Sequence, residues 1–327
     1  MRKLDVALEH LNEKNIECGI VLKPENIFYL TGFFPSSQAA LLLKREPLLL
    51  VSRMDAKLAS AGCVEFKVFE KFEKELKLEY RNIGIEKKYA NIKFYEKYLA
   101  GKNIQDLNFI EEMRKIKGRE EIEKIKKAIK IAGDALVEAV NAIEGKTERE
   151  VAAMAEYAIR KKAGAAFEAI VASGKNSSIP HHTPSDKKIK PDEAVIIDIG
   201  AKVGCYNSDI SRTINSNPDI YGAVIEAQRA GIKECYAGNE INSADSAVRG
   251  VLREYALEEF FLHSSGHGVG IEVHEAPKIA KDTEGKFEAG MVVTIEPGVY
   301  RDFGVRVEDM ILIGKSPKIL SKKVKPC

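Results

Sequence analysis

The chain has 327 residues, of which 45% are hydrophobic and 31% charged, and its formal net charge is +2. This composition is that of an ordinary globular protein, and the small net charge gives no reason to expect nucleic acid or an acidic membrane surface as the main partner. Because the chain is long for one compact domain, we expect two domains.

The N-terminus, MRKLDVALEHLNEKNIE, carries charges every few residues and has no apolar core, so we do not expect a signal peptide. No apolar stretch approaches the roughly 18 residues that a membrane span requires. The five cysteines form no C-x-x-C pair, which argues against a structural zinc site and a disulfide framework. We therefore expect a cytoplasmic protein without a membrane partner.

Helical and strand patterns alternate over the first part of the chain. We predict helices over Leu4–Leu11, around Asp55–Ala61 and over Ile92–Leu99. Strands are predicted at CGIVL, AALLL, PLLLV, VEFKVF and NIGIE, of which VEFKVF alternates as a half-exposed strand does. This order indicates an α/β unit.

A different pattern begins at Arg119. Apolar residues recur every three or four positions from Ile122 to Ile143, which predicts a long amphipathic helix with Gly145 as its C-cap. Thr147 and Glu150 have the spacing of a capping box, so a second helix is expected to begin there.

Further helices and strands follow this long helix. We predict helices over Pro218–Tyr236 and after an N-cap at Ser243, and strands at AIVAS, AVIIDIG, MVVTIEPG and GVRVEDMILI. The charged stretch Glu111–Glu121 separates the two patterns. The sequence therefore predicts domains over residues 1–112 and 113–327.

Acidic residues interrupt several of the apolar strands. Asp198 lies in VIIDIG and Glu296 ends VVTIE, while Asp209 and Glu308 lie in YNSDISRT and GVRVED. A buried acid requires a partner or a metal ion, because desolvation of its charge is costly. Taken singly, each could instead cap a turn, precede a proline kink or lie on an exposed strand face.

Taken together with a histidine, the four acids favour a metal site. Oxygen-rich ligation with one nitrogen suits hard or borderline divalent ions, and manganese or cobalt suits it better than thiolate-seeking zinc. Four negative charges in one cavity would repel one another without cations. Two ions roughly 3.5 Å apart, bridged by carboxylates, would offset that repulsion.

The stretch SGHGVGIEVHEAP holds two histidines among glycines. It contains G-x-G-x-x, but the dinucleotide-binding pattern fails at Glu272, and no G-x-x-x-x-G-K-[ST] occurs in the chain. VHEAPK is not H-E-x-x-H, so a single-zinc helix site is also unsupported. A phosphate-binding loop is therefore disfavoured.

Several blocks, in order, resemble the aminopeptidase P, prolidase and creatinase branch of the pita-bread metallopeptidases, over nearly the whole chain. The blocks are PENIFYLTGF, MRKIKGREEIEKIKKA, IVASGKNSSIPHH, DIGAKVGCYNSDISRT, SGHGVGIEVHEAP, TIEPGVY and VRVED. The resemblance implies a creatinase-like α/β N-terminal domain followed by an α+β pita-bread catalytic domain.

The resemblance also implies the site residues. It assigns the metal ligands to Asp198, Asp209, His267, Glu296 and Glu308. His274 matches a histidine that contacts the region of the scissile carbonyl, and His181 matches another active-site histidine. His263 matches a third histidine, and Arg306 an arginine that helps to order the site.

The activity implied is hydrolysis of the peptide bond before proline, assisted by two divalent ions, Mn²⁺ or Co²⁺. Glu296 would accept a proton from water, and His274 would stabilise the oxyanion. Related prolidases often place an arginine after the H-E-x-P block to pair with the carboxylate of a dipeptide, whereas this chain has Lys278. The choice between a Xaa-Pro dipeptidase (prolidase) and a Xaa-Pro aminopeptidase that acts on longer peptides therefore remains open, with a slight preference for prolidase.

Other members of the fold fit less well. Creatinase lacks the ligand set, methionine aminopeptidase lacks the N-terminal domain, and catalytically inactive pita-bread modules that bind peptides have degenerate ligand positions. Dimers are common in the family, so the resemblance leads us to expect a homodimer that acts on proline-containing peptides.

Overall fold

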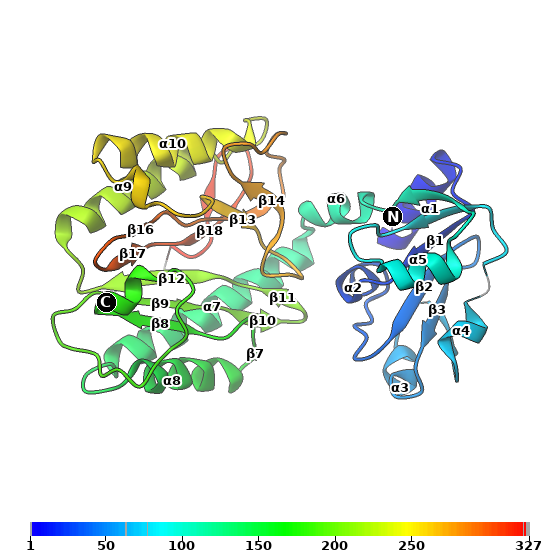
Figure 1. The fold of residues 1–327 in the computed structure, drawn as a ribbon, viewed down its shortest axis with the longest axis horizontal. Coiled ribbons are helices and arrows are strands. Elements are labelled where there is room, and N and C mark those ends of the chain that lie inside the picture. The colour runs from blue at the N-terminus through cyan, green and yellow to red at the C-terminus, as the bar shows by residue number, and fades with distance from the viewer. Residues whose placement is uncertain (1, 63, 77, 323, 325–327) are drawn as a thin grey trace. The chain divides into compact units, whose positions relative to one another are not determined.

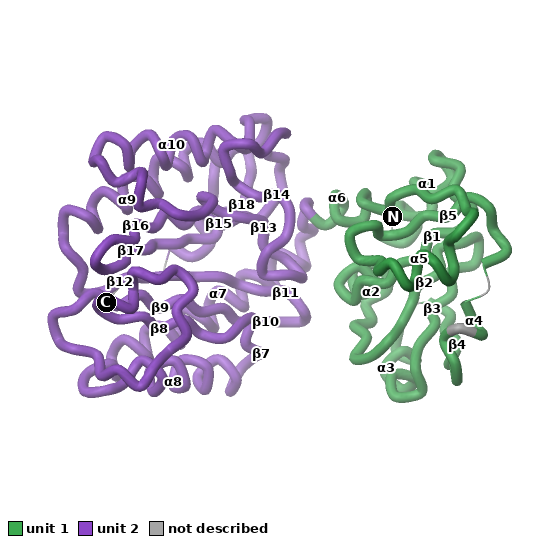
Figure 2. Tube along the Cα trace, viewed as in Figure 1, with its two compact units in different colours: residues 1–114 green, residues 115–327 purple. Residues whose placement is uncertain are grey.

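The computed structural model describes residues 2–62, 64–76, 78–322 and 324. The chain divides into two compact units, residues 1–114 and 115–327, which are coloured separately in Figure 2. Each unit has its own hydrophobic core. In the described part of the chain, no helix combines the length and the apolar character needed to cross a membrane.

Unit 1 is built on a six-stranded mixed sheet with the strand order β4-β3-β2-β1-β5-β6. Its strands are β1 (Cys18–Val21), β2 (Ala39–Leu43), β3 (Leu48–Val51), β4 (Glu65–Val68), β5 (Asn82–Ile85) and β6 (Asn103–Asp106). Its helices are α1 (Lys3–Glu13), α2 (Pro24–Thr31), α3 (Ala56–Ala59), α4 (Phe72–Glu75), α5 (Ile92–Tyr98) and α6 (Phe109–Lys115).

The position of each strand in this sheet explains its sequence. β1 and β2 are central and buried along their whole length, so both read as continuous apolar runs. β4 forms one edge of the sheet, and most of its residues are exposed. The prediction of an α/β unit with a strand at VEFKVF is confirmed, but this strand is exposed along most of its length and not half-exposed.

Unit 2 contains four longer helices and a larger set of short strands. Its helices are α7 (Arg119–Asn141), α8 (Glu148–Arg160), α9 (Pro218–Glu234) and α10 (Ile241–Glu254), with 3₁₀ turns η1 (Gly174–Ser178) and η2 (Glu258–Phe260). Its strands are β7 (Gly164–Ala165), β8 (Ile170–Ser173), β9 (Val195–Ile199), β10 (Ala201–Val203), β11 (Tyr206–Asn207), β12 (Ile210–Ile214), β13 (Gly266–Gly268), β14 (Glu275–Ile279), β15 (Val292–Ile295), β16 (Gly298–Tyr300), β17 (Gly304–Arg306), β18 (Asp309–Leu312) and β19 (Lys318–Ile319).

These strands form sheets that lie between two pairs of helices. Figure 1 shows α7 and α8 on one side of the strands of unit 2 and α9 and α10 on the other. One sheet has the order β12-β9-β8, and another has the order β14-β13-β15-β18-β19. Acidic residues at the ends of strands from both sheets can therefore meet in the interior of the unit.

The helix ends of unit 2 confirm one predicted cap and correct two others. Thr147 Oγ1 accepts a hydrogen bond from the Glu150 amide, and the Glu150 carboxylate accepts one from the Thr147 amide, so the capping box is present. α7 ends at Asn141, and Gly145 lies beyond it in a turn with φ of 71°. α10 begins at Ile241, so Ser243 lies inside its first turn and is not its N-cap.

Candidate metal centre

The five residues expected to bind metal come from five different strands or strand ends of unit 2. Asp198 lies in β9, Asp209 immediately precedes β12, His267 lies in β13, Glu296 immediately follows β15, and Glu308 immediately precedes β18. β9 pairs with β12 in one sheet, and β13, β15 and β18 are neighbours in another. The cluster therefore lies where these two sheets face each other.

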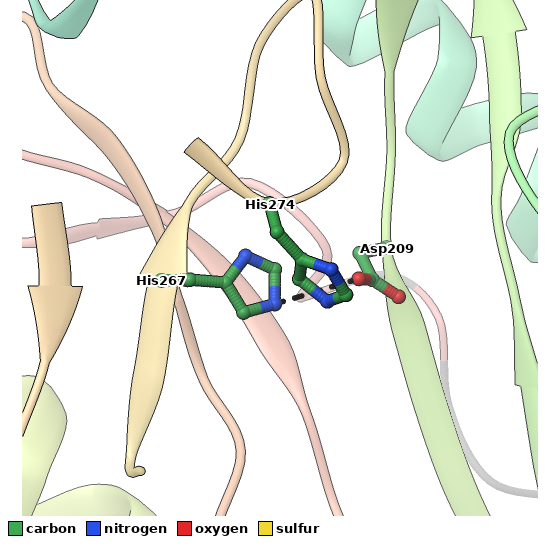
Figure 3. A group of neighbouring side chains, drawn as sticks. All are labelled: Asp209, His267 and His274. Atoms are coloured by element: carbon green, nitrogen blue, oxygen red, sulfur yellow. Dashed lines mark ion pairs between the residues drawn. The ribbon is translucent and has the colours of Figure 1, made fainter. Parts of the chain in front are cut away.

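The ligand atoms of these residues converge. Three overlapping groups each have ligand atoms within 4.8 Å of one another; they are Asp209, His267 and His274; His267, Glu296 and Glu308; and Asp198, Asp209 and Glu308. Nε2 of His267 lies 3.6 Å from Oδ2 of Asp209 and 3.4 Å from Oε1 of Glu296. Figure 3 shows the rings of His267 and His274 next to each other, with both directed towards Asp209.

The orientation of His267 leaves one ring nitrogen available for a cation. Nδ1 of His267 lies 3.1 Å from the carbonyl oxygen of Gly268. Because a carbonyl oxygen only accepts hydrogen bonds, Nδ1 carries the proton and Nε2 keeps its lone pair. Burial and the neighbouring His274 lower the pKa of His267 to about 4, so the ring is neutral at pH 7, as metal ligation requires.

Three carboxylate oxygens of the cluster lack the hydrogen-bond partners that a buried charge requires. Oδ1 of Asp198 and both carboxylate oxygens of Glu308 are buried and have no hydrogen-bond partner among the described residues. Each such group costs free energy unless a ligand satisfies it. A set of four carboxylates and one imidazole, in which three carboxylate oxygens lack a partner among the described residues, fits divalent cations.

Three carboxyl groups of the cluster, those of Asp209, Glu296 and Glu308, favour protonation in the absence of cations. Burial and the carboxylates of Glu308 and Asp198 hold the pKa of Asp209 well above its usual range. Burial, with the carboxylates of Glu296 and Asp198, does the same for the pKa of Glu308. Burial raises the pKa of Glu296 to about 8. Divalent cations would replace these protons and offset the repulsion among the carboxylates.

Arg306 connects the acidic cluster to a second polar network. Its Nη2 donates to Oδ2 of Asp198 at 2.7 Å, its Nε to Ser211 Oγ at 2.9 Å and its Nη1 to the hydroxyl of Tyr300 at 2.8 Å. Arg306 is 3% exposed and Glu308 is 1% exposed, so the alternative that both lie on an exposed strand face is wrong.

Tyr300 links Arg306 to His263. The Nδ1 atom of His263 lies 2.9 Å from the carbonyl oxygen of Ser264, so it is the protonated nitrogen, and Nε2 accepts. The Tyr300 hydroxyl, 2.9 Å from that Nε2, therefore donates to His263 while it accepts from Arg306. Tyr300 was not expected from the sequence, although a tyrosine closing the block TIEPGVY is a residue whose hydroxyl needs a partner when it is buried.

His181 lies in the exposed turn that follows η1. Burial lowers the pKa of His263 to about 4, and it also lowers the pKa of His274. The charge of His181 contributes to the lowering in both cases. His181 is thus close enough to both histidines to interact with them electrostatically. Nη1 of Arg306 donates to the carbonyl oxygen of Pro180 at 3.1 Å and anchors the turn beside the cluster.

A second anchor of this turn is Glu148, at the start of α8, whose side chain is fully buried. Its carboxylate accepts hydrogen bonds from the amides and hydroxyls of Ser173 and Ser185 and contacts Nε2 of His182 at 2.9 Å. Glu148 was not singled out from the sequence. Its role depends on residues that come much later in the chain.

Two of the expected substrate-binding residues lie outside the group of buried ligands. His274 is exposed, and its ring makes an edge contact with that of His267, with centroids 4.2 Å apart. Lys278 is also exposed and is the cross-strand partner of His267 in the β13–β14 pair. Since directly paired residues project from the same face of a sheet, Lys278 lies on the face that carries His267.

Comparisons with known proteins agree with this geometry. The sequence model of metallopeptidase family M24 matches residues 123–315, and that of the creatinase/prolidase N-terminal domain matches residues 3–116. The Xaa-Pro dipeptidase of Pyrococcus furiosus is 37% identical over 338 residues, which cover 95% of this chain and 94% of that protein.

Solved structures of two related enzyme types also match. The prolidase from Pyrococcus horikoshii OT3 has a TM-score of 0.93 and 35% identity and covers 98% of both chains. The X-Pro aminopeptidase from Thermotoga maritima has a TM-score of 0.89 and 31% identity, again over 98% of both chains.

Proposed function

The chain belongs to metallopeptidase family M24, its catalytic unit has the pita-bread fold, and from this premise we propose that it is a Xaa-Pro dipeptidase. The observation that carries the proposal is the convergence of four carboxylates and one neutral imidazole. Three buried oxygens of these carboxylates have no partner among the described residues. The match to the Xaa-Pro dipeptidase of Pyrococcus furiosus, which extends over nearly the whole of both chains, supports the choice of substrate.

Asp198, Asp209, His267, Glu296 and Glu308 would hold two divalent ions. The donor set is rich in oxygen, which supports Mn²⁺ or Co²⁺ as the metal. When bound, such ions polarise the scissile carbonyl and lower the pKa of water.

The remaining steps belong to side chains of this chain. Glu296 is the proposed general base: its Oε1 lies 3.4 Å from Nε2 of His267 and accepts a hydrogen bond from the hydroxyl of Thr294 at 3.4 Å. The exposed ring of His274 is the proposed hydrogen-bond donor to the carbonyl oxygen as negative charge develops there. His181 and His263 are proposed to contribute to substrate binding.

Lys278 is the proposed partner of the substrate carboxylate. It is exposed and lies on the same face as His267, one strand further from the ligands. An ammonium group can pair with a carboxylate as a point charge, although it lacks the two-pronged geometry of arginine. A free carboxylate on the proline itself occurs only in a dipeptide, which is why this residue supports the dipeptidase activity.

A second candidate is a Xaa-Pro aminopeptidase that acts on longer peptides. It is supported by the match to the Thermotoga maritima X-Pro aminopeptidase and by the absence, at position 278, of an arginine that could bind the carboxylate of a dipeptide with two hydrogen bonds. The two candidates share the metal centre and differ only in what lies beyond the proline.

Substrate cleavage by the metal-loaded enzyme tests both candidates. The apo-protein is supplied with Mn²⁺ or Co²⁺, and hydrolysis of a Xaa-Pro dipeptide is compared with that of the matching Xaa-Pro-Yaa tripeptide. A higher kcat/KM for the dipeptide supports the proposal, a higher value for the tripeptide supports the second candidate, and cleavage of neither by protein with bound metal refutes both.

The ligand assignment has its own test. His267→Ala is expected to bind one divalent ion per chain where the unchanged protein binds two, as measured by titration calorimetry and metal analysis. His10→Ala, in unit 1, is the matched control and should keep both ions. Retention of two ions by His267→Ala would contradict the assignment.

We also propose that the protein works as a homodimer in the cytoplasm, as its resemblance to dimeric members of the family suggests. Light scattering coupled to size-exclusion chromatography gives the molar mass in solution. A mass equal to that of one chain would contradict the homodimer.

A further inference from the structure

A buried lysine near the start of unit 2 pairs with the residue that follows His274. Nζ of Lys117 lies 2.8 Å from Oε1 of Glu275, and the two side chains are 1% and 6% exposed. Two charges are rarely removed from water to this extent unless each compensates the other. The pair is separate from the cluster of metal ligands and has no part in the chemistry proposed above.

Lys117 is held firmly on its own side of the pair. Its amide donates to the carbonyl oxygen of Gly290 at 2.9 Å, and the preceding residue, Ile116, forms a β-bridge with Met291. Its Nζ also donates to the carbonyl oxygen of Lys115 at 3.2 Å. The ammonium group therefore offers Glu275 a fixed point of attachment just before α7.

Glu275 occupies the inner side of the turn that carries His274. A Cβ atom placed on Gly270 would lie 2.3 Å from Oε1 of Glu275, so the carboxylate fills the space beside that glycine. His274, in the bend immediately before β14, is exposed, whereas the side chain of Glu275, the first residue of β14, is buried. The same short segment thus fixes the side chain of Glu275 in the interior and leaves the preceding one, that of His274, exposed to substrate.

The opposite end of this turn is attached next to the metal ligands. Asn207, two residues before Asp209, donates from its amide nitrogen and its side chain to the carbonyl oxygen of Gly270. With Gly270 held there and Glu275 held by Lys117, both ends of the segment that leads to His274 are restrained.

We propose that Lys117 and Glu275 are positioning residues for His274. This inference rests on the function proposed above for His274. Loss of the ammonium group would remove a charge that offsets that of the buried carboxylate, and the turn would move to bring this carboxylate closer to water. His274 would move with it, and a displacement of about 1 Å at a catalytic group can reduce the rate about 100-fold.

A double-mutant cycle in the full-length enzyme tests the proposal. We expect Lys117→Met to reduce kcat about 10- to 100-fold while two metal ions remain bound. In a His274→Ala background the same substitution should change kcat very little, because the group that it positions is absent. Lys126→Met removes the cation of an exposed ion pair on α7 and, as the matched control, should leave kcat unchanged in both backgrounds.

A second variant guards against a failure to fold. Lys117→Met/Glu275→Gln removes both charges of the pair together, so it should fold even where Lys117→Met does not, and it should show the same dependence on His274. An equal loss of kcat with and without His274, or loss of a metal ion in either variant, would overturn the proposal.

A measurement without substrate separates this inference from the proposed function. In apo-protein labelled with ¹³C at histidine Cε1, the signal of His274 is identified by its loss in His274→Ala. Lys117→Met should shift or broaden that signal while the signal of His263 stays in place. If the wild-type enzyme cleaves no Xaa-Pro peptide, the proposed function fails and this spectrum still decides the inference; an unchanged His274 signal would refute it.

Discussion

The guanidinium group of Arg306 holds one oxygen of Asp198 and leaves the other without a partner. Nη2 of Arg306 lies 2.7 Å from Oδ2 of Asp198, and the two side chains are 4% and 13% exposed. Oδ1 of Asp198 is buried and receives no hydrogen bond from the described residues. One oxygen is thus used to orient the carboxylate, and the second is available to a cation.

We therefore expect Arg306→Met to reduce the affinity of the site for divalent metal ions. Loss of a hydrogen bond that orients a metal ligand typically reduces metal affinity about 10- to 100-fold. Titration calorimetry with Mn²⁺ measures this change directly. Arg301→Met, an exposed change in the same β16–β17 hairpin, is the control and should bind metal normally. Normal metal affinity in Arg306→Met would show that Asp198 is oriented without it.

Lys278 should contribute to the binding of substrates in which the proline carboxylate is free. Lys278→Met is expected to raise KM for a Xaa-Pro dipeptide about tenfold, since a charged hydrogen bond is lost, and to change KM for the tripeptide much less. Lys278→Arg should lower KM for the dipeptide, because arginine can bind a carboxylate with two hydrogen bonds. Steady-state kinetics on both substrates test this, with Lys281→Met as an exposed control. Equal increases in KM for both substrates would mean that Lys278 does not recognise the carboxylate.

Metal binding should release protons at neutral pH. Burial raises the pKa of Glu296 to about 8, and burial with neighbouring carboxylates raises the pKa values of Asp209 and Glu308, so the apo site holds protons at pH 7. Bound cations require the ionised acids, so about one proton or more per chain should be displaced. Metal affinity should therefore increase as the pH rises towards 8.

Calorimetry in buffers of different ionisation enthalpy counts these protons, because the observed heat then varies linearly with the buffer. A heat of binding that is the same in every buffer at pH 7 would contradict the prediction. Binding to His267 adds no proton to this count, since its ring is already neutral.

Glu148 should stabilise the catalytic unit at neutral pH. Burial opposes its ionisation, but hydrogen bonds from Ser185, Ser173 and His182 outweigh burial and lower its pKa to about 2. A lowered pKa means that the stabilisation is complete above the ordinary carboxyl pKa of 4.5 and is lost as the pH falls from there towards 2. Glu148→Gln should reduce the free energy of unfolding by about 2 kcal/mol at pH 7.

Urea unfolding at pH 7 and at several values below pH 4.5 measures both effects. The difference between Glu148→Gln and the unchanged protein should shrink as the pH falls, because the advantage of the ionised carboxylate disappears. Glu254→Gln, an exposed change at the end of α10, should follow the unchanged protein. A difference that is constant with pH would mean that the charge of Glu148 is not what stabilises the fold.

Some of the expected donors of the metal centre are marked locally in the sequence, and the resemblance to the family extends them to the full set. Asp198 and Glu296 interrupt or end apolar strands, where an acid without a partner is costly, and His267 lies among glycines. The capping box of Thr147 and Glu150 was equally predictable, since both partners lie within one helical turn. Information of this kind depends only on neighbouring residues.

The alternation of residues around Glu308 left its environment undecided. A strand pattern specifies that Arg306 and Glu308 share a face, but the same pattern fits an exposed face or a buried one. Only the packing of β17 and β18 against β12 buries both side chains and makes Glu308 a possible ligand.

The supporting residues around the site were decided by the tertiary structure alone. Glu148 meets His182, Tyr300 meets His263, and Lys117 meets Glu275 across segments that are distant in the chain. Each of these residues has an ordinary local role as well, in a helix cap, a strand or a charged linker. A hydrogen bond or ion pair between distant segments forms only after the sheets have packed, so neither composition nor periodicity encodes it, whereas an acid that interrupts an apolar strand can be recognised from that strand alone.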